Sequence, residues 1–352
     1  MKKRIRIMHL LQSSRFSGAE NVVCQIFKMF EKNDEIEMIY CSKDGKIREA
    51  LSERNIPFLA LTEFSTSQVR KAIKQFSPDL IHAHDMKASY IAALAAPHVQ
   101  LISHIHNNSF ESRGLSIKSV AYLFAAIHAK HIFWVSDAAY KGYCFHELLE
   151  KKSSVLYNII DLTELNRKLN LEKTEYHYDL IFLGRITEVK NPLMLIDVLS
   201  DLKTHIPNVK MAIVGTGNME KEVRQCVIQK GLEHNVDFLG FIKNPYKLLH
   251  DTKVLIMTSL WEGTPMAALE ALALGVPVVS TPTDGLVAII KNDYNGYLFE
   301  KTSELSNCIY NILCNPLKHR ELSNNAKKWS QEYNNVYKYK VELIKQYKKD
   351  IH

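Results

Sequence analysis

The sequence predicts an α/β protein made of two doubly wound domains. Short apolar runs alternate along the chain with amphipathic segments, which is typical of parallel sheets covered by helices on both faces. The chain has 352 residues, which is long for one core and sufficient for two domains of ordinary size. We place the first domain at residues 1–165, the second at residues 166–332, and a closing helix at residues 333–352.

Charge and cysteine content argue against several classes of protein. Residues 1–170 hold 23 Lys+Arg against 17 Asp+Glu, and the remainder holds 22 against 21, so the positive surplus lies in the first half. No basic stripe with interleaved aromatics occurs, so we expect no nucleic acid partner and favour an anionic acceptor or membrane surface. The six cysteines form no Cys-x-x-Cys pair, which fits reduced thiols in a cytosol. No apolar run approaches the ~18 residues that would span a bilayer, so we expect a cytoplasmic protein.

The first domain begins with a strand and a glycine-containing loop. Ile5–Leu11 has the apolar pattern of a buried strand, and apolar residues from Val22 to Phe30 recur at helical spacing. Between them, Gly18 would allow the backbone to approach a ligand at the carboxyl end of the strand, where open α/β sheets bind ligands. On its own, this loop is equally consistent with a plain connecting turn.

Histidines end two later strands of the first domain. We expect further strands at residues 37–41, 56–59, 79–84, 101–106 and 132–136, with helices at residues 47–54 and 69–76. His82 and His84 lie on one side of their strand, but histidines at a strand end are more often polar side chains than metal ligands, so we predict no metal. His106 is a better functional candidate than His104, because the last residue of a strand opens on the crevice.

The segment Arg113–His131 combines an apolar patch with basic flanks. Residues 120–127 are almost entirely apolar, and Arg113, Lys118 and Lys130 surround them together with histidines. This pattern is typical of a helix that lies on an anionic membrane surface. A buried helix explains it equally well.

The second domain follows a polar stretch, Leu162–Tyr176, that we interpret as a linker. A strand at residues 178–183 precedes Gly184 and Arg185, and Lys190 follows shortly before a helix that starts at residue 192. An arginine fork and a mobile lysine after one strand suit a diphosphate, whose negative charge grows as it departs. Exposed surface charge is the alternative.

Two further loops of the second domain point to a nucleotide. Gly215 and Gly217 follow the strand at residues 209–214, but Glu220 replaces the third glycine of a dinucleotide fingerprint, which disfavours a nicotinamide enzyme. The strand at residues 237–240 leads into Phe241 and Ile242. We expect the last helices at residues 305–313, 321–329 and 333–347.

The whole chain is organised around residues 254–280. Thr264 and Pro265 form the pattern of an N-cap and a first helical residue, so we expect a helix that begins at Pro265 and continues through Met266. The first backbone amides of that helix, next to Gly263, would accept a phosphate.

Two carboxylates flank this predicted phosphate site. Glu262 lies in the loop before the helix and Glu270 lies within it. Carboxylates repel phosphate but pair well with vicinal hydroxyls, so a phosphate between two sugars fits both groups. A nucleotide diphosphate sugar is such a molecule.

Glu262 and Glu270, separated by seven residues and followed by Ala-Leu-Gly-Val-Pro-Val-Val, resemble the signature of retaining glycosyltransferases of the family 4 type. Their fold is GT-B, with two Rossmann-like domains facing across a cleft and a C-terminal helix that returns to the first domain. The resemblance spans nearly the whole chain and is strongest from Ile181 to Ser280. The chain departs from the family at Ser17 and Ile159, where glycines are usual, and at Ala288.

The resemblance implies a role for each candidate residue. Arg185 and Lys190 would contact the donor phosphates, Glu262 the hydroxyls of the donor sugar, Glu270 the ribose, and His106 the sugar near its sixth carbon. The remaining candidates for donor binding are Gly18, Gly184, Gly215, Gly217, Phe241, Ile242, Gly263, Thr264, Pro265 and Met266. No Asp-x-Asp motif occurs, which fits chemistry without a metal or any cofactor beyond the donor.

The sequence therefore predicts a retaining transferase that moves a hexose or N-acetylhexosamine from a nucleotide diphosphate sugar, expected to be a UDP-sugar. The resemblance further implies a glycan or polyprenyl-linked acceptor in bacterial capsule or exopolysaccharide synthesis, at the inner face of the plasma membrane. A GT-B epimerase or phosphorylase is the nearest alternative. A carbohydrate-binding protein without activity on the same scaffold is a further one.

Overall fold

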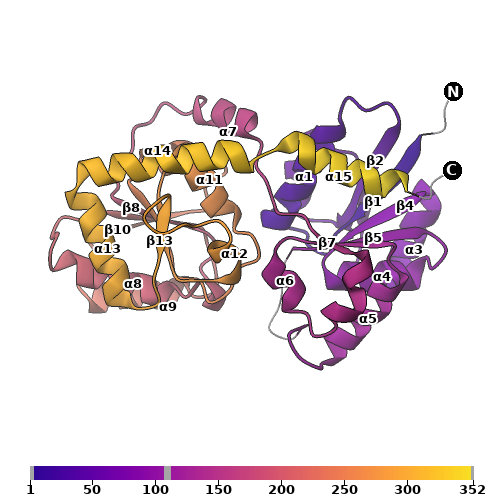
Figure 1. Ribbon diagram of the computed structural model, residues 1–352, viewed down its shortest axis with the longest axis horizontal. Helices are drawn as coiled ribbons and strands as arrows, with labels where there is room; N and C mark the ends of the chain where they lie inside the picture. The colour runs from indigo at the N-terminus through magenta and orange to yellow at the C-terminus, as the bar shows by residue number, and fades with distance from the viewer. Residues whose placement is uncertain (1–3, 107–111, 350–352) are drawn as a thin grey trace. The chain divides into compact units, whose positions relative to one another are not determined.

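The computed structural model describes residues 4–106 and 112–349. The chain forms two compact units (Figure 1). Unit 1 comprises Met1–Ile159 and Val336–His352, and unit 2 comprises Ile160–Asn335. Each unit contains one parallel sheet with helices on both faces, so the predicted pair of doubly wound α/β domains is confirmed.

The sheet of unit 1 has seven strands in the order β3-β2-β1-β4-β5-β6-β7, all paired in parallel. The strands are β1 (Ile5–Leu10), β2 (Ile36–Lys43), β3 (Phe58–Leu61), β4 (Leu80–His84), β5 (Gln100–Ile105), β6 (His131–Trp134) and β7 (Ser153–Val155). The central strands β1 and β4 are buried over most of their length, including the polar residues His9, His82 and His84.

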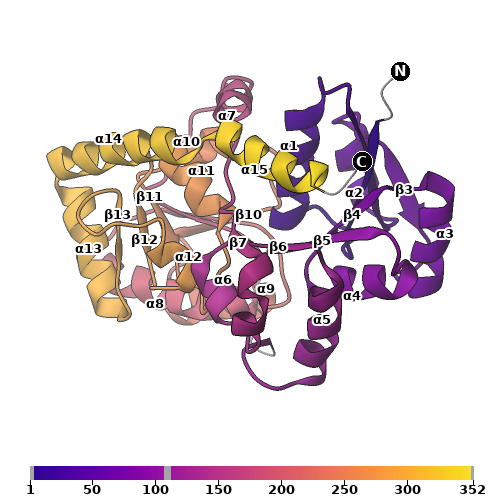
Figure 2. The ribbon, with the colours of Figure 1, turned by 45° about the vertical axis from the view of Figure 1, so that its right-hand side comes forward.

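Helices cover both faces of this sheet. The helices of unit 1 are α1 (Gly18–Phe30), α2 (Ile47–Ser52), α3 (Thr66–Phe76), α4 (Met86–Ala95), α5 (Ile117–His128), α6 (Asp137–Lys141), the 3-10 helix η2 (His146–Lys152) and α15 (Val336–Lys348). Helices α3, α4 and α5 pack side by side on one face, where they enclose the main core (Figure 2). On the other face, Phe27 and Phe30 of α1 and Tyr347 of α15 lie against the sheet or each other.

The sheet of unit 2 has six strands in the order β10-β9-β8-β11-β12-β13, again all parallel. The strands are β8 (Leu180–Leu183), β9 (Met211–Val214), β10 (Val236–Gly240), β11 (Val254–Met257), β12 (Val278–Ser280) and β13 (Gly296–Leu298). The helices are α7 (Leu162–Leu169), the 3-10 helix η3 (Glu188–Lys190), α8 (Pro192–Lys203), α9 (Glu220–Gln229), α10 (Tyr246–Asp251), α11 (Met266–Leu274), α12 (Asp284–Val287), α13 (Thr302–Cys314) and α14 (Pro316–Tyr333).

Two separate cores hold unit 2 together. Helices α8, α9 and α13 cover one face of the sheet, and α7, α10, α11 and α14 cover the other. Strand β11, the apolar run that the sequence placed at the centre of the domain, is entirely buried between them. Buried side chains on both of its faces explain why Val254–Met257 shows no polar alternation.

Three sequence predictions differ from the structure. The predicted linker Leu162–Tyr176 contains a helix, α7, because Leu162, Leu165 and Leu169 pack into a core of unit 2. Unit 2 therefore starts at Ile160, earlier than the predicted residue 166. Helix α11 begins at Met266, since Pro265 keeps an extended backbone (ψ 114°) and occupies the cap position predicted for Thr264.

Candidate functional site

The candidate residues after β8 and β9 lie in two loops that touch through their backbones. A Cβ at Gly215 would lie 1.9 Å from the carbonyl oxygen of Gly184, and one at Gly217 would lie 1.9 Å from that of Ile186. Gly215 also has a φ of +133°, which side chains rarely adopt. These glycines are therefore required for the approach of the two loops. The approach leaves Arg185 exposed at the carboxyl end of β8.

Lys190 and Glu262, predicted to contact different parts of the donor, form an ion pair with each other. The Lys190 and Glu262 side chains are only 18% and 11% exposed, and Ser259 Oγ donates to the same Glu262 oxygen at 2.7 Å. The pair is supported by backbone contacts, because Thr258 Oγ1 donates to the Lys190 carbonyl at 3.0 Å. The loops after the neighbouring strands β8 and β11 thus place a cation and a carboxylate together.

The start of α11 lies directly after this ion pair. Gly263, the buried Thr264 and the buried Pro265 connect Glu262 to Met266, the first helical residue. Since the first amides of a helix have no intrahelical acceptor, this end of α11 is suited to an anion. The backbone is thus consistent with the predicted phosphate-binding helix start, although the helix begins one residue later than predicted.

The short helix α12 closes this region from the other side. A Cβ at Gly285 would lie 1.5 Å from the Gly263 carbonyl oxygen, so only glycine fits there. The Gly285 amide donates to the carbonyl of Glu262 at 3.3 Å, and Thr281 Oγ1 donates to that of Ser259 at 2.7 Å. The loop that carries Glu262 is therefore held by contacts from two directions.

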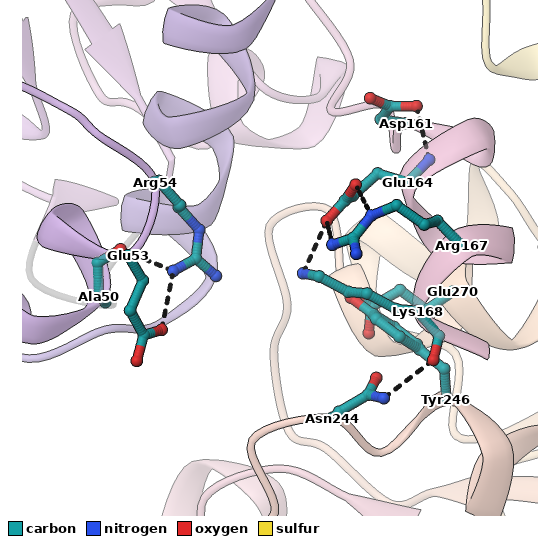
Figure 3. A network of polar contacts seen from close by, with 10 residues as sticks. All are labelled: Ala50, Glu53, Arg54, Asp161, Glu164, Arg167, Lys168, Asn244, Tyr246 and Glu270. Atoms are coloured by element: carbon teal, nitrogen blue, oxygen red, sulfur yellow. Dashed lines mark hydrogen bonds and ion pairs between the residues drawn. The ribbon is translucent and has the colours of Figure 1, made fainter. Parts of the chain in front are cut away.

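Glu270 lies one turn further along α11 and is 9% exposed. Burial raises the pKa of its carboxyl group to about 7. The hydroxyl of Tyr246 donates to Glu270 Oε1 at 3.2 Å, and this bond together with the charge of Lys168 lowers the pKa in part (Figure 3). A buried carboxyl group with one neutral donor has the capacity to accept further hydrogen bonds from ligand hydroxyls.

A network from three elements surrounds Glu270 (Figure 3). Lys168 on α7 lies 5.7 Å above the Tyr246 ring, and its carbonyl accepts a hydrogen bond of 2.9 Å from Asn244 Nδ2. Glu164 lies 3.7 Å from Lys168 Nζ. Sequence analysis missed Tyr246 and Lys168, because both lie far from Glu270 in the chain and Lys168 fell in the predicted linker.

The loop after β10 holds the residues predicted to meet the base. Gly240 has a φ of +65° and its carbonyl accepts a bond from the Gly215 amide at 2.8 Å. The next residue, Phe241, is 69% exposed, and Ile242 is partly buried. A large exposed aromatic ring at the carboxyl end of a strand suits stacking against a planar ring.

In unit 1, Gly18 is the first residue of α1, preceded by the extended Ser17. Sequence analysis missed the buried carboxyl group of Glu20, which is 3% exposed and accepts a hydrogen bond from Ser17 Oγ. Burial raises the pKa of Glu20. The only available signal was a glutamate in the first turn of a helix, which is too common to single it out.

His106, the other candidate of unit 1, directly follows β5 and is 8% exposed. Its Nε2 lies 2.8 Å from Nδ1 of His84, and its amide donates to Asp85 Oδ1 at 2.9 Å. Burial lowers the pKa of His106 to about 3, so the ring is neutral at pH 7. Asn107 lies outside the described residues.

The predicted basic flank of α5 is smaller than expected. His131 is 8% exposed and bonds to Ser154 Oγ at 2.8 Å, and burial lowers its pKa to about 4. It therefore carries no charge on the surface. Within the described residues, no helix has the length and apolar character needed to cross a membrane.

Both units match models of known protein families. Residues 163–329 match Glycosyl transferases group 1, and residues 16–164 match Glycosyltransferase Family 4. Candidate residues from both units fall within these matches.

Relatives from bacteria and archaea carry glycosyltransferase names. A UDP-Gal:alpha-D-GlcNAc-diphosphoundecaprenol alpha-1,3-galactosyltransferase of Escherichia coli is 24% identical, over 84% of each chain. The capsular polysaccharide biosynthesis glycosyltransferase CapH of Staphylococcus aureus is 25% identical over 76% of this chain and 78% of that one. An uncharacterised glycosyltransferase of Methanocaldococcus jannaschii is 31% identical over 61% of this chain, a match that spans 58% of that protein.

Solved structures share the fold of this chain. Anabaena HepE in complex with UDP-glucose has a TM-score of 0.85 at 22% identity, covering 97% of this chain and 99% of that one. Staphylococcus aureus TarM, in complex with UDP and other ligands, has a TM-score of 0.80 at 14% identity, covering 98% and 100%. The likeness at such low identity establishes the fold, and the predicted GT-B fold is confirmed.

Proposed function

The chain is a GT-B glycosyltransferase of the family 4 type, and we propose that it transfers a hexose or N-acetylhexosamine from a UDP-sugar with retention of configuration. The acceptor in this proposal is a glycan or lipid-linked glycan of bacterial surface polysaccharide synthesis, at the cytoplasmic face of the membrane. The names of the Escherichia coli and Staphylococcus aureus relatives support this class of acceptor. The complexes of HepE and TarM support a UDP-linked donor.

One observation carries the proposal: a cation, a carboxylate and a helix start lie together after β8 and β11. The Lys190–Glu262 pair immediately precedes the start of α11. In the proposed complex the diphosphate lies at the α11 amides and near Arg185 and Lys190. Glu262 accepts hydrogen bonds from the sugar hydroxyls, and Glu270 accepts them from the ribose.

The proposed reaction takes place on one face of the donor sugar. The bond between the anomeric carbon and the diphosphate oxygen breaks, and its electron pair leaves with the diphosphate. The acceptor oxygen forms the new bond on the same face and loses its proton to the departing oxygen. Arg185 and Lys190 stabilise the negative charge that develops on the diphosphate. The chain requires no metal for this step. In the same proposed complex, His106 contacts the sugar near its sixth carbon.

Glu262 is poorly suited to act as a covalent nucleophile. Its Oε1 is already held by Lys190 Nζ and by Ser259 Oγ, so its lone pairs are directed to these donors. A carboxylate in such a cluster orients hydroxyl groups more readily than it attacks carbon. Retention by attack on the same face requires no such nucleophile.

The test is a screen of UDP-, GDP- and ADP-sugars with polyprenyl-diphosphate glycan acceptors. We expect release of UDP only when both donor and acceptor are present, unchanged by added Mg²⁺ or Mn²⁺, and an anomeric configuration in the product, read by NMR, that matches the donor. Free UDP or an epimerised sugar nucleotide without acceptor would instead identify a hydrolase or epimerase. Absence of any binding by a nucleotide sugar would leave only a carbohydrate-binding protein.

We further propose that α5 attaches the protein to an anionic membrane surface. Ile117, Val120, Phe124 and Ile127 lie on one side of this helix and are between 40% and 90% exposed. Arg113, Lys118 and His128 are exposed beside them. Apolar contact with lipid and attraction to acidic headgroups act together in such a surface.

Vesicle sedimentation tests the attachment. Vesicles that contain phosphatidylglycerol should bind the protein more tightly than phosphatidylcholine vesicles, and the double variant Ile117→Ser, Phe124→Ser should lose most of this binding. Leu171→Ser, which removes an apolar side chain that is 66% exposed in unit 2, is the matched control. Equal binding by the double variant and the control would refute the role of α5.

A further inference from the structure

Five histidines lie on one face of the unit 1 sheet. They come from three adjacent strands, with His9 on β1, His82 and His84 on β4, and His104 and His106 at the end of β5. The parallel register places His9 opposite His82, and His84 opposite His104. Because side chains two residues apart point to the same face of a strand, all five rings meet there. None is more than 8% exposed.

The hydrogen bonds of this cluster leave several ring nitrogens without a partner. His9 Nδ1 lies 3.0 Å from His84 Nε2, His84 Nδ1 lies 2.8 Å from His106 Nε2, and His82 Nδ1 lies 2.8 Å from the hydroxyl of Tyr347. Among the described residues, both nitrogens of His104 and Nδ1 of His106 are buried without a hydrogen bond. A buried polar atom without a partner is costly, so the nitrogens of His104 in particular indicate a missing ligand.

Three of the histidines converge closely enough to bind one metal ion. One ring nitrogen from each of His84, His104 and His106 lies within 4.8 Å of the others. Two imidazole nitrogens on one tetrahedral zinc ion are about 3.3 Å apart, so a small adjustment of the rings would admit the ion. We propose that His84, His104 and His106 form a site for a divalent first-row transition metal of the Zn²⁺ class.

The chemistry of the three rings fits such an ion. Imidazole nitrogen suits Zn²⁺, Ni²⁺ and Cu²⁺, whereas Mg²⁺ and Ca²⁺ prefer oxygen ligands. No carboxylate is needed to hold the ion, and Asp85 bonds the backbone of His106.

A fourth histidine can accept the hydrogen bond that the second ring nitrogen of a metal-bound imidazole usually donates. If Nδ1 of His84 binds the ion, its Nε2 carries the proton and donates to His9 Nδ1, 3.0 Å away. If Nε2 of His106 binds the ion, its Nδ1 carries a proton that remains available to a ligand. The ion would thus determine the tautomer of each ring.

A second trio, His9, His82 and His84, also lies within 4.8 Å, but it fits less well. In this trio, His9 and His82 each have one hydrogen-bonded nitrogen, whereas neither nitrogen of His104 has a partner among the described residues. The hydrogen-bonded nitrogen of His82 pairs with the hydroxyl of Tyr347. The trio His84, His104 and His106 is therefore the site that we assign.

Metal content of the purified protein provides the direct test. The chain should be prepared with a cleavable tag that contains no histidine, dialysed, and measured by inductively coupled plasma mass spectrometry. We expect about one equivalent of Zn²⁺ per chain, lost in His104→Phe and kept in His131→Phe, which removes a buried imidazole on the neighbouring strand β6. Substoichiometric metal that is equal in all three proteins would mean an adventitious ion only and would overturn the proposal.

Titration with Co²⁺ keeps the proposal testable if His104→Phe does not fold. Metal-free wild-type protein should develop the visible absorption of four-coordinate Co²⁺ with saturation at one equivalent, and its Tm should rise with added Zn²⁺. No absorption and no change in Tm would overturn the proposal. Neither measurement involves sugar transfer, so this proposal and the proposed function fail separately.

Discussion

The two units share one sheet topology but place different chemistry at the ends of their strands. In each, the order is third, second, first, fourth, fifth and sixth strand, and unit 1 adds a seventh. In unit 1, β4 and β5 end in neutral imidazoles, whereas in unit 2 the loops after β8 and β11 carry Arg185 and the Lys190–Glu262 pair. The shared fold therefore determines where binding residues can lie, and the residues after each strand determine what is bound there.

The buried groups of the two units respond to pH in opposite ways. Burial lowers the pKa of the five clustered histidines of unit 1, so the unfolded chain binds their protons below pH 6.5 while the folded chain does not. Stability is then lost as the pH falls. Burial raises the pKa of Glu270 in unit 2 from 4.5 to about 7, so the folded chain holds a proton that the unfolded chain releases. Stability is then lost as the pH rises through that window.

The largest expected effect is acid destabilisation of unit 1. Each buried histidine contributes up to about 1.4 kcal/mol per pH unit, between pH 6.5 and a folded pKa that is about 3 for His9 and His106. Amide exchange measured at pH 7, 6 and 5 should show that the strands of unit 1 lose protection first. The variant His82→Phe should reduce the loss of unfolding free energy per pH unit by about the contribution of one histidine. Equal loss of amide protection in both units would show that the two units do not differ in their response to acid.

The next largest effect is that of Lys190→Ala on turnover. Loss of this cation should lower kcat/KM by about 10² to 10³, or about 3–4 kcal/mol, because the departing diphosphate loses a charged partner. Steady-state UDP release gives the measurement. Lys221→Ala, which changes an exposed lysine of α9, should have no effect.

Lys190→Ala also leaves Glu262 mostly buried without its cation, so stability must be measured in parallel. The double variant Lys190→Ala, Glu262→Gln should recover stability but not activity, since it removes the uncompensated charge. Recovery of activity in the double variant would show that Lys190 serves only to neutralise Glu262.

A smaller effect is expected from Glu270→Gln. At pH 8 the wild type holds a buried carboxylate whose pKa is about 7, so the neutral variant should be more stable by up to about 3 kcal/mol. At pH 5 the difference should fall to about 1 kcal/mol, because the carboxyl group is then protonated in the folded chain and only partly ionised in the unfolded chain. Urea unfolding at both pH values measures this, and UDP binding by the variant should weaken about tenfold, as expected for one lost polar contact.

Glu222→Gln is the matched control for Glu270→Gln, because Glu222 is exposed on α9. It should change neither stability nor UDP binding at either pH. A stabilisation of Glu270→Gln that is the same at pH 5 and pH 8 would mean that the Glu270 carboxyl group does not titrate in this range.

The smallest expected effect is that of Tyr246→Phe. The variant removes the hydroxyl that donates to Glu270 at 3.2 Å, so the pKa of Glu270 should rise further and stability should fall by about 1 kcal/mol. Carbon-detected NMR of labelled glutamate follows this titration. Tyr178→Phe, which removes a bond to Asp237 elsewhere in unit 2, should leave the titration unchanged.

The fold and the local motifs could be predicted because their signals lie within short stretches. Apolar runs mark strands, and Glu262, Pro265 and Glu270 lie in one segment. The ion pair between Lys190 and Glu262 could not be predicted, because it joins residues 72 positions apart through the pairing of β8 with β11.

The histidine cluster could not be predicted from the sequence either. Each pair of histidines was visible on its own strand, but the parallel register that stacks β1, β4 and β5 determines that they meet. The helix α7, in contrast, could have been found. Leu162, Leu165 and Leu169 recur at helical spacing within a charged stretch, and the charges obscured them.

The last helix, α15, has a consequence for the biosynthesis of the protein. Tyr347 bonds His82 in the interior of unit 1, yet every residue of unit 2 is translated before α15. A nascent chain therefore emerges from the ribosome with one side of its first sheet only partly covered, while the later unit is free to fold to completion. Chaperones that bind exposed apolar surface would act mainly during this interval.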